Sequence, residues 1–140
     1  MSGSARPAVT AAVIAALAGD AALVSALGGS PKVWVNVPDG TVAPYLWVLG
    51  GEEIPIERAM GGHAHRRGVG LEITAVSSHR GTAEVDALIS RVIEVVLAGP
   101  AVVGYTAVWR FVVNRRPVQI EVDDGTVAWM GTVLFEVQLV

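Results

Sequence analysis

The middle of the chain decides the fold, because residues 82–100 read TAEVDALISRVIEVVLAGP. Apolar side chains recur in this segment at intervals of three and four residues, which is the spacing of a helix with one buried face. The residues on this face are Val85, Leu88, Ile89, Val92, Ile93 and Val96. Gly99-Pro100 ends the pattern. We therefore expect one long amphipathic helix in the centre of the chain.

A second helical pattern comes at the start of the chain, from Pro7 to Leu27, with the same three- and four-residue spacing. Gly19-Asp20 interrupts this pattern, and Asp20 is a good N-cap for a second short helix. Gly28-Gly29 then stops the helix. The pattern predicts a broken N-terminal helix, preceded by a flexible N-terminus over residues 1–7.

Alternating apolar and polar residues predict strands on both sides of the central helix. The run DDGT at residues 123–126 is a hairpin signal before the last strand. The expected strands are Lys32–Val37, Tyr45–Leu49, Val69–Ala75, Tyr105–Asn114 and Val127–Leu139. This order predicts a single α+β domain over residues 1–140. Its mainly antiparallel sheet has about four to five strands, with the N-terminal helix and the long central helix packed on one face.

The composition excludes several classes of protein. The chain has 140 residues, of which 52% are apolar and only 16% charged, and its mean hydropathy is +0.53. Its longest charge-free apolar stretch, Pro7–Gly19, ends at Asp20, well short of the roughly 20 residues of a membrane span. The net charge of −3 and the lack of a basic stripe speak against sequence-specific nucleic-acid binding. We expect a soluble protein with an unusually uncharged surface.

One segment gathers much of the charge. Between residues 51 and 67 no regular period is visible, and six of the 23 charged residues fall there together with two histidines. We expect a mobile loop, since a long irregular segment in a compact domain is usually functional or mobile. The residues expected to contact a partner are Glu52, Glu53, Glu57, Arg58, His63, His65, Arg66 and Arg67.

No motif points clearly to catalysis or to a cofactor. His63 and His65 have a spacing that could hold a metal ion in a strand, but no third ligand is indicated by its spacing. Glu52 and Glu53 are adjacent, so in a strand they would point to opposite faces. The chain has no cysteine, which removes thiolate chemistry. Its four tryptophans favour core packing, although Trp109-Arg110 is also typical of a protein interface.

Three segments in the same order resemble a known family. They are residues 18–28 (AGDAALVSALG), residues 43–50 (APYLWVLG) and residues 76–85 (VSSHRGTAEV), the last leading into the central helix. Together they resemble the tail-completion, or tail-terminator, proteins of long-tailed bacteriophages, prophages and gene transfer agents. The resemblance covers residues 8 to 140, and the matching residues look structural.

The resemblance implies a small subunit, not an enzyme, that assembles with itself as a six-fold ring. Such a ring caps the head-proximal end of the tail tube, stops its growth and offers a surface to the head. The implied partners are further copies of the chain, the major tail tube protein and the head–tail connector protein, within a virion assembled in the host cytoplasm. No cofactor, metal or membrane is implied.

Three alternatives remain open at this stage. The first is another neck or head-closure protein of the same particle. The second is a small metal-dependent enzyme using His63 and His65, and the third is a ligand-binding dimer with a two-fold interface.

Overall fold

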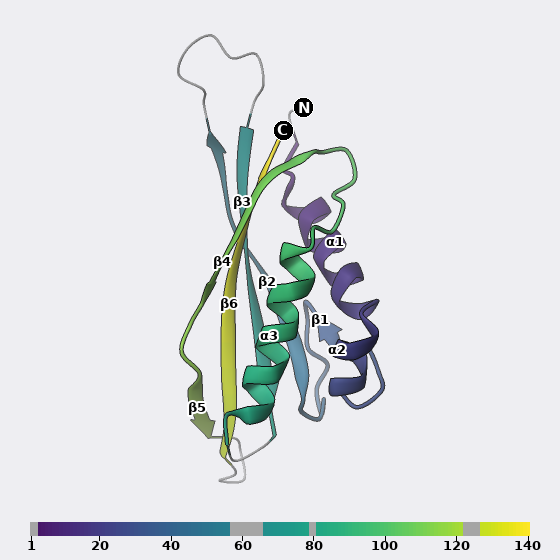
Figure 1. Cartoon of the computed structure of the whole chain (residues 1–140), viewed down its shortest axis with the longest axis vertical. Helices are drawn as coiled ribbons and strands as arrows, with labels where there is room; N and C mark the ends of the chain where they lie inside the picture. Colours follow the sequence, from purple (N-terminus) through teal and green to yellow (C-terminus); the bar gives the residue numbers. More distant parts are fainter. Residues whose placement is uncertain (1–2, 57–65, 79–80, 122–126) are drawn as a thin grey trace.

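The computed structural model describes residues 3–56, 66–78, 81–121 and 127–140. In these residues two helices are followed by three strands, a third helix and three more strands, which confirms the α+β class (Figure 1). The helices are α1 (Arg6–Ala18), α2 (Ala21–Ala26) and α3 (Ala83–Leu97). The strands are β1 (Val33–Trp34), β2 (Tyr45–Ile56), β3 (Arg66–Ser77), β4 (Ala107–Asn114), β5 (Val118–Glu121) and β6 (Val127–Leu139).

The strands form one sheet in the order β1-β2-β3-β6-β4, with β5 pairing beside β4 along the same edge of β6. All pairs are antiparallel except β1 with β2, which is parallel. The expected hairpin before the last strand is confirmed by its arms, because Glu121 of β5 faces Val127 of β6. The turn residues 123–126 lie outside the described residues.

The helices all pack on one face of this sheet (Figure 1). Alternate residues of β6, namely Val133, Phe135, Val137 and Leu139, are buried beneath them, as the alternating sequence predicts. Gly131 continues this row and lets α3 approach β6 closely. A Cβ atom there would lie 2.9 Å from Ile89 Cγ1 and 3.0 Å from Val85 Cγ2. The periodic face of α3 is therefore buried against the sheet.

The irregular segment expected over residues 51–67 is shorter in the structure. β2 does not end at Leu49 but continues to Ile56, and β3 begins at Arg66. The alternation is hidden because the register shifts between Gly50 and Glu53, where a β-bulge interrupts the two-residue period. Residues 57–65 lie outside the described residues.

Two further expectations change at the ends of elements. Only Val33–Trp34 of the expected strand Lys32–Val37 pairs with the sheet. The expected flexible N-terminus over residues 1–7 is cut short, since Ala5 is fully buried and α1 begins at Arg6.

Asp20 links α2 to α3. Its Oδ2 accepts a hydrogen bond from Leu23 N at 3.0 Å, which confirms the expected N-cap. Arg91 of α3 donates from Nε to Oδ2 at 2.7 Å and from Nη2 to Oδ1 at 2.6 Å. The Arg91 hydrogen bonds hold the pKa of Asp20 below its ordinary value, assisted by Leu23 N and opposed by burial. One carboxylate thus fixes α2 against α3.

Replacing this carboxylate should destabilise the fold. Asp20→Ala removes the cap and both Arg91 contacts, and we expect the free energy of unfolding to fall by about 1–2 kcal/mol in urea titrations. Glu94→Ala is the matched control, because Glu94 accepts from the same Arg91 at 2.6 Å but is exposed. Its loss should cost less than about 0.5 kcal/mol. Equal effects of the two substitutions would contradict the role given to Asp20.

Candidate assembly surface

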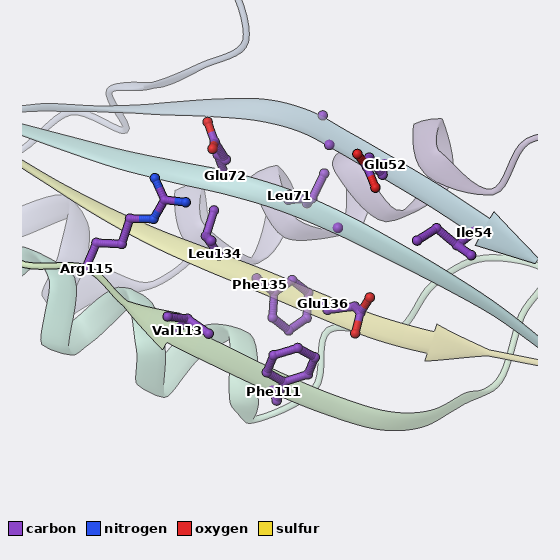
Figure 2. A pocket seen from close by; sticks show the side chains of 13 residues that line it. Glu52, Ile54, Leu71, Glu72, Phe111, Val113, Arg115, Leu134, Phe135 and Glu136 are labelled. Carbon is purple, nitrogen blue, oxygen red and sulfur yellow. The ribbon is translucent and has the colours of Figure 1, made fainter. Parts of the chain in front are cut away.

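The sheet face opposite the helices, which we call the open face, is covered by no element of the described chain (Figure 2). Several large apolar side chains on it remain exposed to solvent. Ile54 of β2 and Trp109 of β4 are each 48% exposed, and Leu49 and Val113 are nearly as accessible. The Trp109 ring stacks at a tilt on Phe111, with 4.6 Å between ring centroids. An apolar surface of this kind is typical of a protein interface.

A hollow of about 530 Å³ lies across β2, β3, β6 and β4 on the open face (Figure 2). Gly51 and Gly70 contribute backbone to its lining, and Gly50 also lines it although a Cβ atom there would lie toward Arg6, 3.1 Å from its Cδ. Gly51 tolerates no side chain, because a Cβ atom there would lie 2.8 Å from the Gly70 carbonyl oxygen. The two glycines after Leu49 therefore belong to the bulge in the sheet, and they do not end the strand.

Charged side chains surround the hollow unevenly. Glu52, Glu72 and Glu136 line it together with Arg115 (Figure 2). Within the described part of the chain none of these four takes part in an ion pair. The open face thus combines apolar side chains with a surplus of carboxylates. No group of three or more potential metal ligands is found among the described residues.

The structure divides the eight residues expected to contact a partner. Glu52 lines the hollow on the open face, whereas Glu53 points to the helix face, so the expected opposition of these neighbours is confirmed. Arg66 and Arg67 begin β3, opposite Ile56 and Pro55 of β2. Glu57, Arg58, His63 and His65 lie outside the described residues, and with them the suggested histidine metal pair.

Glu53 is a structural residue rather than an exposed contact. Its Oε1 accepts hydrogen bonds from Ala5 N at 2.6 Å, Arg6 N at 2.9 Å and Ser4 Oγ at 3.0 Å. Arg67 Nη1 lies 3.8 Å from Oε2 and also donates to the Gly3 carbonyl. The Glu53 carboxylate therefore accepts hydrogen bonds from backbone N–H groups at the start of α1. Negative charge is favourable at this end of a helix.

These contacts set the ionisation of Glu53. Burial alone would raise the pKa of Glu53, but the hydrogen bonds from Ser4, Ala5 and Arg6 and the charge of Arg67 together lower it. The carboxylate is therefore ionised in the folded chain at neutral pH, and it fixes the N-terminus of α1 to the end of β2.

Sequence reasoning found part of the open face. It identified Trp109 as a candidate interface residue, and Trp109 is indeed exposed on β4. It missed Leu49, Ile54 and Val113, because an apolar residue in a strand is normally assigned to a core. The sequence AVWRFVVN of β4 could have indicated the open face. It places apolar residues on both faces of the strand, although only one face meets helices.

The fold and this surface define an α+β subunit with one side of its sheet uncovered. The family model "Tail completion protein gp17" matches residues 11–133. The chain therefore belongs to the tail-completion protein family, and it has a structural role in the assembly of a phage-type tail.

No curated protein matches the sequence. Among solved structures, a chain from the "Virion of native gene transfer agent (GTA) particle" matches with a TM-score of 0.70 and 22% sequence identity. The match covers 99% of this chain and 98% of the other. At this identity the likeness shows a shared fold. No helix in the described part of the chain is both long and apolar enough to cross a membrane.

The structural role of Glu53 can be tested by measuring how the stability of the chain depends on pH. Its pKa is lowered from the ordinary value of 4.5, so its contribution to stability is present above that value. The contribution is lost as the pH falls through the lower pKa of the folded state. Glu53→Gln should reduce the free energy of unfolding at neutral pH by about 1–2 kcal/mol and weaken the loss of stability in acid. Thermal unfolding followed by circular dichroism from neutral pH into the acid range measures both effects.

Glu52→Gln is the matched control for this test. Glu52 is the neighbouring carboxylate, it is exposed, and it lies on the opposite face. Its substitution should leave the acid dependence close to that of the unmodified chain. A Glu53→Gln variant with unchanged acid dependence would contradict the assigned role of Glu53.

Proposed function

We propose that copies of this chain form a ring, most simply a hexamer, that caps the head-proximal end of the tail tube. The ring ends polymerisation of the tube protein and then forms the surface to which the head–tail connector binds. It is assembled in the host cytoplasm and stays in the virion. Membership of the tail-completion family supports the location, and the uncovered open face is the observation that carries the proposal of a ring.

A closed ring needs two different patches on each subunit, one for each neighbour. The two outer strands of the open face supply them, because Leu49 and Ile54 are exposed on β2 and Trp109 and Val113 are exposed on β4. The uncharged composition of the chain agrees with a subunit whose neighbours cover much of its surface.

The end of the sheet formed by β2 and β3 is proposed to face the tail tube or its lumen. Glu52 and Arg66 stand near this end, and Glu57, Arg58, His63 and His65 follow or precede them in sequence. Glu53 and Arg67 contribute to it by anchoring the N-terminus of the chain. Replacement of Glu57, Arg58, His63 and His65 by Ala or Ser, with Glu53 and Arg67 unchanged, should abolish tail joining. The protein should still unfold at an unchanged temperature. Normal infectious particles from this variant would contradict the contact.

The proposed capping activity is tested on tail tubes. Purified chain is mixed with tubes of the major tail protein, and the particles are examined by negative-stain electron microscopy and native mass spectrometry. We expect one ring at one end of each tube and a halt in tube growth. A strict monomer that binds no tube would contradict the proposal. Binding to the connector without binding to the tube would instead indicate another neck protein.

The open face can be tested by one exposed residue. Trp109→Ser should weaken self-association about tenfold or more, since buried tryptophans contribute strongly at interfaces. Its monomer stability should change little, because Trp109 is half exposed. Val42→Ser is the matched control, because Val42 is exposed but lies before β2 and outside the open face. Sedimentation equilibrium measures both variants, and equal self-association of the two would exclude Trp109 from the interface.

A further inference from the structure

β2 and β4 each have a stretch of backbone with no neighbouring strand on its outer side in the described structure. β1 pairs with β2 only at Leu46 and Trp47, so β2 from Val48 onwards pairs on one side alone in the described structure. At the other edge, β4 pairs only with β6 among the residues that the structure describes. One carbonyl near the first edge is occupied, since Arg6 Nη1 donates to the Gly51 oxygen at 2.9 Å.

The register shows how these edges correspond. Leu49 of β2 faces Glu72 of β3, which faces Leu134 of β6, which faces Val113 of β4. Further along β2, Ile54 corresponds to Trp109 of β4 through the same kind of register across β3 and β6. The strand order β2, β3, β6, β4 across the open face can be followed in Figure 2. The free stretches of β2 and β4 therefore lie level with each other.

The directions of the two edge strands also match. β2 and β6 run one way and β3 and β4 the other, because successive pairs are antiparallel. A second copy related by rotation about an axis along the strands keeps these directions. Its β4 then meets β2 of the first copy as an antiparallel pair, with both open faces on the same side.

Edge strands of monomeric proteins usually carry devices that prevent such pairing, such as lysine, proline or a bulge. β4 has no lysine or proline, its register shift lies at its start between Ala107 and Trp109, and Trp109 and Val113 are exposed. On β2 the features that hinder pairing follow Leu49 in the chain: first the bulge after Gly50, and then Pro55. The stretch around Leu49 is thus the part of β2 that is most open to a partner strand.

We propose that β4 of one copy pairs antiparallel with β2 of the next copy, with Leu49 opposite Val113 or Phe111. The proposal rests on the ring of the proposed function and specifies its interface. Because the two edges differ, the contact is head-to-tail and repeats from copy to copy. The sheets then join into one continuous wall, and the open faces of all copies line the same side of it.

Disulfide cross-linking tests this pairing, since the chain has no cysteine of its own. The double variant Leu49→Cys/Val113→Cys is oxidised in the assembled state, alone and on tail tubes. Within one chain the two positions are three strand spacings apart, about 14 Å, whereas a disulfide needs Cα atoms within about 7 Å. Any disulfide therefore joins two copies. A second double variant, Leu49→Cys/Phe111→Cys, covers the register with Phe111.

The matched control is Leu49→Cys/Val112→Cys, because Val112 is adjacent to Val113 but faces the helices. We expect a ladder of covalent dimers, trimers and larger species from a double variant on the open face. The control and the single variants should give none of these larger species. Denaturing electrophoresis shows the ladder, and native mass spectrometry of the same samples gives the state of assembly.

The outcomes separate the two proposals. A ring on the tube without cross-links in either open-face variant overturns the strand pairing and leaves the capping function standing. Cross-links that stop at the dimer, or that form equally in the control, also overturn it. A disulfide to a cysteine placed in the tube protein, without any between copies, assigns the edge to the tube instead. A monomer that binds no tube overturns both proposals.

Discussion

Burial of only one face of the sheet is the constraint on which the rest of the structure depends. α1 and α3 both pack on that face, and the missing side chain at Gly131 brings α3 down onto β6. The open face then gains no cover from the described chain. Its apolar side chains and the outer edges of β2 and β4 remain available for contacts between molecules. An exposed apolar surface of this kind is typical of a protein interface.

Two carboxylates hold the helices in place by the same physical means. Asp20 accepts from Leu23 N at the start of α2, and Glu53 accepts from Ala5 N and Arg6 N at the start of α1. Each is also paired with an arginine, Arg91 and Arg67 respectively. In a chain with only 16% charged residues, these pairs explain why some of the charge is retained. The charges on the open face, in contrast, have no ion-pair partner in the described structure.

Periodic segments allowed most of the fold to be predicted from the sequence. The buried face of α3, the cap at Asp20 and the alternation of β6 are local patterns, and each is confirmed. The extension of β2 could not be predicted, because the bulge at Gly50 breaks the alternation and Glu53 is satisfied by residues almost fifty positions away. The open face was equally hidden, since exposure of Leu49 or Ile54 depends on which face the helices cover.

Amide hydrogen exchange of β4 tests most directly whether the uncovered side of the sheet is the assembly surface. In the free chain, the backbone N–H groups on the outer edge of β4 have no strand partner and should exchange rapidly. In rings on tail tubes, the amides of β4 and of β2 near Leu49 should exchange at least tenfold more slowly, whereas those of the exposed residues around Val42 should not change. Unchanged exchange of β4 in a complete ring would contradict assembly through this side of the sheet.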